Sequence, residues 1–132
     1  AHGLYRPEDL GGLSVTRFCE AVCAEGVSCH AGCNRPMHLH PLFNTCDVYG
    51  DGRPTRLASP DHDPRQPAGS LPVTEAMNSR VYSIPWFKYN RPAIIAEHAA
   101  AYRKVAENYK DLLAADPGNP SALGGWHFFT HR

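Results

Sequence analysis

The chain has 132 residues, of which 42% are hydrophobic, and its 13 basic and 13 acidic side chains cancel at neutral pH. This composition is typical of one folded domain with a modest core and is not that of a disordered chain. The charge balance argues against a nucleic-acid-binding surface, and no apolar run is long enough to cross a membrane. We therefore expect neither nucleic acid nor a membrane among the partners.

The number of cysteines predicts whether the protein is in a reducing or an oxidising compartment. Five cysteines are an odd number, whereas a secreted disulfide framework usually has an even number. We therefore expect free thiols in a reducing, cytoplasmic environment, several of them buried as small hydrophobic residues. The chain begins with Ala1 and shows no signal peptide, so we expect a trimmed, processed or fragmentary chain.

The first 30 residues predict a strand, a helix and a second strand. Residues 2–5 have the character of a strand end. Ser14 is a favourable N-cap for a helix that runs to about Glu25, and Gly26 suits the left-handed residue that ends it. Residues 27–30 then read as a strand. The inward face of the helix carries residues at helical spacing, namely Val15, Phe18, Cys19 and Val22.

The middle of the chain is irregular. Residues 44–70 contain turn-forming residues and four prolines without hydrophobic periodicity, which predicts a long loop. Ser70-Leu71-Pro72 opens a second, shorter helix, because proline is tolerated in a first helical turn. Residues 81–87 alternate in character and predict a short strand that Pro85 ends.

The last third predicts the longest helix and an aromatic tail. Asn90 caps the helix, Pro92 lies in its first turn, and residues 116–118 end it. The tail, residues 119–132, contains three large aromatic side chains and is expected to dock on this domain or a neighbour. They are Trp126, Phe128 and Phe129.

These elements together predict an α+β fold in which about three helices pack on a short-stranded sheet. We treat residues 1–132 as one domain with a long loop at 44–70. Because an isolated pair of strands is not stable alone, the sheet is expected to gain a missing strand or to pack on another domain.

A cluster of thiols and imidazoles permits a zinc site by count. Its members are Cys19, Cys23, Cys29, Cys33, His30, His38 and His40. However, Cys19 and Cys23 lie on the inward side of the predicted helix, where thiols serve as core residues. We therefore expect no metal, and a zinc-stabilised module remains an alternative. A non-catalytic domain that binds partners through its aromatic tail and open sheet edge is another.

The segment from Cys33 to Phe43 concentrates binding chemistry between two prolines. A guanidinium such as that of Arg35, with Asn34 beside it, can clamp a carboxylate or phosphate, although from these residues alone a solvated arginine is the default interpretation. His38 and His40 are two residues apart, and we expect at most one of them to face a given site.

Four segments stand in the order of a known family. They are Phe18-Cys19-Glu20-Ala21 through Ala24-Glu25-Gly26-Val27; Pro36-Met37-His38 with Pro41-Leu42-Phe43; Leu71-Pro72-Val73-Thr74-Glu75 through Ser83-Ile84-Pro85; and the helix after Pro92. In this order they resemble the C-terminal part of the pyridoxal-phosphate-dependent sugar aminotransferases of the DegT/StrS type. The resemblance covers roughly residues 10–113.

The resemblance implies a fold type I enzyme of which this chain is most of the small C-terminal domain. The large domain of the same polypeptide, absent from this chain, would bind pyridoxal 5'-phosphate and carry the Schiff-base lysine. The resemblance thus implies no catalytic or cofactor-binding residue here, and this fragment alone should be inactive. The complete enzyme would be a homodimer in sugar biosynthesis that moves an amino group from glutamate or glutamine to a keto sugar or keto cyclitol.

The resemblance also assigns substrate-binding roles. His38 would lie nearest the small-molecule substrate, and Asn34 and Arg35 would help to orient it. Two departures leave the substrate class open. Many relatives have an aromatic residue near Cys33 or Asn34, and the excursion at 49–69 is longer than the family pattern implies.

Overall fold

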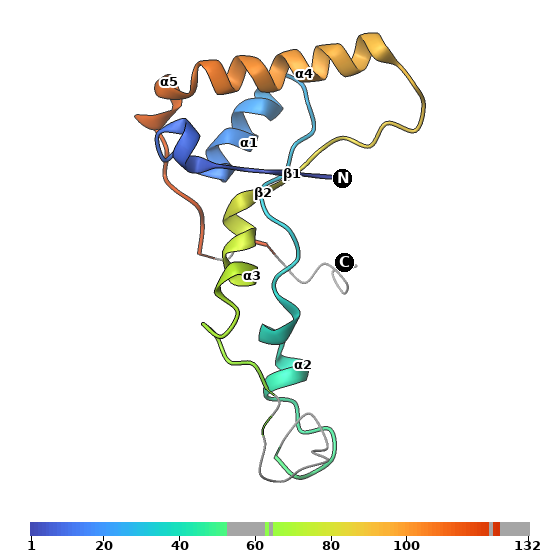
Figure 1. The fold of residues 1–132 in the computed structure, drawn as a ribbon, viewed down its shortest axis with the longest axis vertical. Helices are drawn as coiled ribbons and strands as arrows, with labels where there is room; N and C mark the ends of the chain where they lie inside the picture. The colour runs from blue at the N-terminus through green and yellow to red at the C-terminus, as the bar shows by residue number, and fades with distance from the viewer. Residues whose placement is uncertain (53–62, 64, 122, 125–132) are drawn as a thin grey trace. The chain divides into compact units, whose positions relative to one another are not determined.

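A computed structural model describes residues 1–52, 63, 65–121 and 123–124 (Figure 1). Among these, residues 1–33 and 77–124 form one compact unit, called here the first unit, and residues 34–76 form the second unit. The described residues contain five α-helices and one two-stranded antiparallel sheet, a small mixed α and β architecture. None of the helices in these ranges is long and apolar enough to span a bilayer.

The sheet belongs to the first unit. Strand β1 (His2–Leu4) pairs with β2 (Val81–Ser83) in the antiparallel sense, with Gly3 opposite Tyr82. A Cβ atom added to Gly3 would lie 2.3 Å from Cζ of Tyr82, so glycine allows this ring to cross the strand. The predicted strands at 2–5 and 81–87 are thus confirmed, although both are shorter than predicted.

The prediction of a strand at residues 27–30 was wrong. Only an isolated bridge, between Ala31 and Tyr82, forms there. The backbone N–H of His30 donates to Oγ of Ser83 at 2.9 Å, while Ser83 N–H donates to the His30 carbonyl at 2.8 Å. A side-chain hydroxyl therefore takes the place of a backbone carbonyl, and a regular ladder does not develop.

Helix α1 (Val15–Ala24) forms as predicted. The Ser14 hydroxyl accepts a hydrogen bond from the Arg17 N–H at 3.1 Å, which confirms Ser14 as the N-cap. Gly26 follows the helix with a φ of 90°, a conformation that glycine adopts at little cost.

The long C-terminal helix differs from its prediction in two ways. It is divided at Asn108 into α4 (Pro92–Glu107) and α5 (Tyr109–Leu113). The backbone N–H and the side-chain amide of Asn108 both donate to the Lys104 carbonyl, at 3.1 and 2.8 Å. The N-cap position of α4 is Arg91 rather than Asn90, and no side chain caps it.

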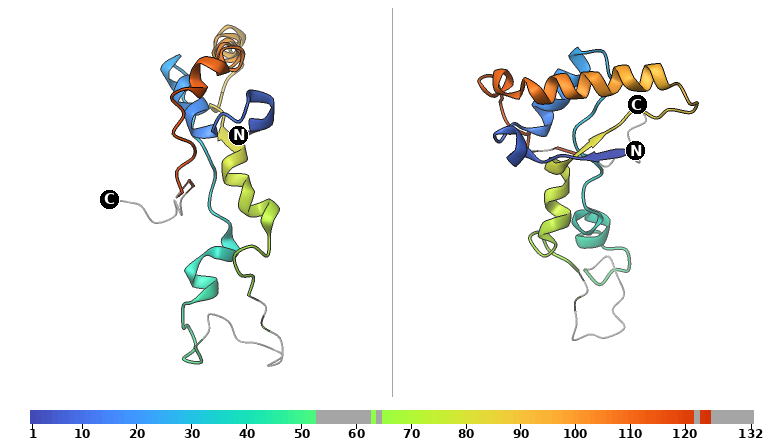
Figure 2. Two further views of the ribbon diagram at one scale, coloured as in Figure 1. Left: turned by 90° about the vertical axis from the view of Figure 1, so that its left-hand side faces the viewer. Right: turned by 45° about the horizontal axis from the view of Figure 1, so that its top comes forward.

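The core of the first unit lies between α1, α4 and the sheet. Helix α4 passes alongside α1 in both orientations (Figures 1 and 2). The Phe18 ring is central, with its centroid 5.1 Å from Tyr5, 5.7 Å from Tyr82 and 6.3 Å from Tyr102. The surrounding buried residues are Leu13, Val15, Cys19, Val22, Val27, Cys29, Ala101 and Val105.

The second unit is built from short elements. It holds a 3₁₀ turn (Met37–Leu39), α2 (Pro41–Asn44) and α3 (Pro72–Ala76). Proline opens α3, which confirms the short helix predicted after Ser70. Part of the predicted loop at 44–70, and the tail aromatics Trp126, Phe128 and Phe129, lie outside the described residues.

Candidate functional site

In the second unit the carboxylate of Glu75 holds the imidazole of His38. Nε2 of His38 lies 3.0 Å from Oε1 of Glu75, and the two side chains are 9% and 23% exposed. His38 comes from the 3₁₀ turn and Glu75 from α3, so the contact joins segments 37 residues apart. Of the predicted site residues, His38 is therefore held in a defined orientation.

Glu75 is itself fixed by the backbone at the start of α3. The Gly69 N–H lies 2.9 Å from each carboxylate oxygen, and the Leu71 N–H donates to Oε1 at 3.3 Å. These hydrogen bonds, the Gly69 one foremost and then that of His38, hold the pKa of Glu75 below its usual value. Glu75 therefore remains an anion at neutral pH and accepts a hydrogen bond from Nε2–H of His38.

The backbone around His38 is fixed from the other side. The Asn44 side-chain amide donates to the carbonyl oxygens of His38 and His40. His40 Nδ1 accepts from the Leu42 N–H at 3.0 Å and so caps α2. His38 and His40 lie on no strand, because these contacts close a tight turn between the 3₁₀ turn and α2.

Asn34 and Arg35 precede this turn and are exposed. Neither side chain hydrogen-bonds to another residue within the described ranges. The structure therefore gives no partner that would orient them toward His38, and of the predicted trio only His38 has a fixed position.

The predicted thiol cluster is divided. Cys19 Sγ lies 3.3 Å from Cys29 Sγ, and the exposed Cys23 thiol donates to the Cys29 carbonyl at 3.1 Å. Cys33, in contrast, pairs with Oδ1 of Asn78 at 3.2 Å. No group of three or more metal-binding side chains gathers in the part of the chain that the structure describes. All five cysteines are free thiols.

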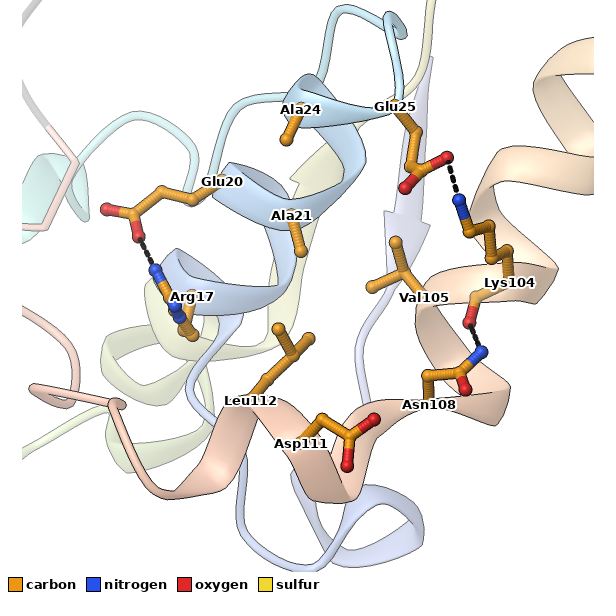
Figure 3. Close-up of a pocket in the computed structure, with 10 residues that line it drawn as sticks. All are labelled: Arg17, Glu20, Ala21, Ala24, Glu25, Lys104, Val105, Asn108, Asp111 and Leu112. Atoms are coloured by element: carbon orange, nitrogen blue, oxygen red, sulfur yellow. Dashed lines mark hydrogen bonds and ion pairs between the residues drawn. The ribbon is translucent and has the colours of Figure 1, made fainter.

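Sequence reasoning missed a groove on the first unit between α1 and the α4–α5 pair (Figure 3). Ala21, Ala24, Val105 and Leu112 form its apolar floor. Ion pairs flank it, Arg17 with Glu20 at 3.2 Å and Lys104 with Glu25 at 2.7 Å. The small side chains on the outer side of α1 were the available signal, but their consequence depends on where α4 packs.

The His38–Glu75 pair offers acid–base and hydrogen-bonding chemistry. A neutral His38 that donates from Nε2 to Glu75 has Nδ1 left as an acceptor, and a protonated His38 has Nδ1 as a donor. Either form suits a hydroxyl or carboxylate ligand.

No protein-family model, curated protein or solved structure matched the chain in the three comparisons.

Proposed function

We propose that this chain is part of the small C-terminal domain of a pyridoxal-phosphate-dependent aminotransferase of the DegT/StrS type. The complete enzyme transfers an amino group from glutamate or glutamine to a keto sugar or keto cyclitol. In this proposal His38 contacts the substrate, and Asn34 and Arg35 help to orient it. The large domain of the same polypeptide and a second subunit complete the active site.

The observation that carries the proposal is the contact between two of the resembling segments. Residues 36–43 and residues 71–85 are separated by the long loop, yet they meet through His38 and Glu75 at 3.0 Å. A carboxylate that accepts two backbone N–H groups and one imidazole is a preorganised support for a ligand-binding histidine. This arrangement supports a role for His38 beyond that of a solvated side chain.

The chemistry suits the proposed substrates. A keto sugar or cyclitol presents several hydroxyl groups, and the amino donor presents a carboxylate. Nδ1 of His38 can accept from a hydroxyl or, when the ring is protonated, donate to a carboxylate. The exposed guanidinium of Arg35 can bind a carboxylate through two parallel hydrogen bonds.

In this proposal the lysine that binds the cofactor belongs to the large domain and not to this chain. Pyridoxal phosphate supplies the electron sink for amino transfer. The chain contains Lys88, Lys104 and Lys110, all of them exposed, and Lys104 is paired with Glu25. None shares the unit of His38, and none has the buried setting of a Schiff-base lysine. These residues do not form a cofactor site, so this chain alone is expected to be inactive.

The first test uses the full-length product of the gene that encodes this chain. Its intact mass and its absorbance before and after borohydride are measured together. A mass above 14.5 kDa with an absorbance band that borohydride removes supports the proposal. A product of this mass without a chromophore contradicts it and favours the partner-binding alternative.

The second test addresses His38 in the active enzyme. His38→Ala is expected to lower kcat/KM by about 10-fold or more, the loss typical of one hydrogen bond to a charged group. His30→Ala is the matched control, because His30 is an exposed histidine of the other unit. Unchanged kcat and KM in His38→Ala would remove the substrate-binding role while leaving the cofactor result intact.

A further inference from the structure

We propose that Cys19 and Cys29 are a redox modification site, a dithiol pair that closes to a reversible disulfide inside the folded first unit. The inference is independent of the proposed aminotransferase function. It rests on the contact between two buried thiols, of which Cys19 comes from α1 and Cys29 from the segment beside β2.

The geometry needs only a small adjustment. The two Sγ atoms are 3.3 Å apart, and a disulfide bond is about 2.05 Å long, so the sulfurs must approach by roughly 1.3 Å. Cys19 lies on α1, whereas Cys29 lies in the irregular segment that follows Gly26. Because residues 27–30 form no regular ladder, this segment can shift more readily than a strand within a sheet.

The surroundings shift the pKa values of the two thiols in opposite directions, so that Cys29 is the nucleophile and Cys19 is its partner. A hydrogen bond from the Cys19 thiol lowers the pKa of Cys29; burial opposes this shift, and a hydrogen bond from the Tyr102 hydroxyl adds to it. The hydrogen bond to Cys29, and then burial, raise the pKa of Cys19. Of the two, Cys29 is therefore the thiol that ionises more readily, and a thiolate beside a thiol is the starting state for disulfide formation.

A peroxide supplies the oxidising equivalents. The Cys29 thiolate attacks one oxygen of hydrogen peroxide, the O–O bond breaks, and hydroxide leaves to become water. Cys19 Sγ then attacks the sulfenic sulfur of Cys29, the S–S bond forms, and the S–O bond breaks. The departing oxygen takes up the Cys19 proton and leaves as a second water. Two thiols lose two electrons, and one peroxide becomes two waters.

Cys19 and Cys29 are 3% and 2% exposed, so the oxidant enters when the segment opens locally. Cys23 is exposed, lies one helical turn after Cys19, and bonds to the Cys29 carbonyl at 3.1 Å. Cys23 therefore competes with Cys19 for a bond to Cys29, and the experiment must distinguish a Cys19–Cys29 link from a Cys23–Cys29 link.

The experiment is disulfide mapping on the full-length gene product after treatment with hydrogen peroxide. Remaining thiols are blocked with N-ethylmaleimide under denaturing conditions, and the chain is cleaved without reduction after glutamate and arginine. Cleavage after Glu20 and Glu25 places Cys19, Cys23 and Cys29 on three different peptides. Fragmentation then distinguishes Cys29 from Cys33, which share the third peptide.

We expect a Cys19–Cys29 link, with Cys23, Cys33 and Cys46 alkylated, and we expect dithiothreitol to reverse it. Cys23→Ser should retain the link, and Cys29→Ser should abolish it. The inference is overturned if Cys19 and Cys29 are both alkylated after oxidation, or if Cys23 replaces Cys19 in the link. Mapping of the unmutated protein decides the question even if the Cys29→Ser variant does not fold.

Discussion

Asp116 completes the cap of α1 by holding Ser14, the N-cap residue, which lies 102 residues earlier in the chain. Its carboxylate accepts from the Ser14 N–H at 2.7 Å and from the Ser14 hydroxyl at 2.6 Å. The Gly118 N–H donates to the same carboxylate at 2.9 Å. The sequence suggested Asp116 only as part of a helix stop, whereas α5 already ends at Leu113.

Replacing this carboxylate should destabilise the first unit. Asp116→Ala leaves the partly buried Ser14 N–H and hydroxyl without their acceptor, and we expect a loss of about 1–3 kcal/mol in the free energy of unfolding. Urea denaturation followed by circular dichroism measures it. Asp111→Ala is the control, because Asp111 is an exposed aspartate on α5. Equal stability of the two variants would show that the cap contributes little.

The same carboxylate predicts a pH dependence. Burial raises the pKa of Asp116, but the hydrogen bonds from Ser14 and Gly118 and the charge of Arg17 outweigh it, so the folded-state pKa is lowered. Its contribution is therefore complete above the unfolded-state pKa and is lost as the pH falls through the folded-state pKa. Stability measured from neutral to acidic pH should decline less steeply in Asp116→Asn. A parallel decline in both proteins would contradict this assignment.

Gly3→Ala should destabilise the sheet. The added Cβ would lie 2.3 Å from Cζ of Tyr82, and that ring is confined between Phe18 and Tyr102, with both centroids 5.7 Å away. We expect a loss of about 1–3 kcal/mol, as for other overpacked sites. Thermal unfolding of Leu4→Ala provides the control, since Leu4 is on the same strand and 61% exposed. A Gly3→Ala protein as stable as this control would mean that the ring moves freely.

Phe18→Ala should have the largest effect on stability. The ring is 5% exposed and lies among Tyr5, Tyr82 and Tyr102, so its removal leaves a cavity at the centre of the core. Such truncations cost about 3–5 kcal/mol. Val73→Ala, at a side chain 77% exposed, should change the unfolding free energy by less than about 0.5 kcal/mol. Similar values for the two would place Phe18 outside the core.

Glu75→Ala should release His38. In the unaltered protein the carboxylate holds the hydrogen on Nε2, so nitrogen chemical shifts of the neutral ring should indicate mainly the Nε2–H tautomer. Without the carboxylate both tautomers should be populated. His98 is the internal reference, because its Nδ1 lies 2.8 Å from the Ile94 carbonyl and it belongs to the other unit. An unchanged His38 spectrum would mean that Glu75 does not orient the ring.

The features that depend on a few neighbouring residues could be predicted from residue type and spacing. Ser14 caps α1 through a donor three residues away, Gly26 follows the helix with a positive φ, and Pro72 opens α3. These effects act within one turn of chain, so spacing and residue type are enough to predict them.

The features that join distant segments became apparent only in the folded chain. The partner of His38, the sulfur contact between Cys19 and Cys29, and the hydrogen bonds that Asp116 accepts from Ser14 each depend on where a second segment lies. The failed strand at 27–30 has the same origin, since the Ser83 hydroxyl displaced a ladder acceptor. A pattern in the sequence states which groups need partners, but folding decides which partner satisfies each group, because desolvated polar groups must be paired wherever the chain brings them.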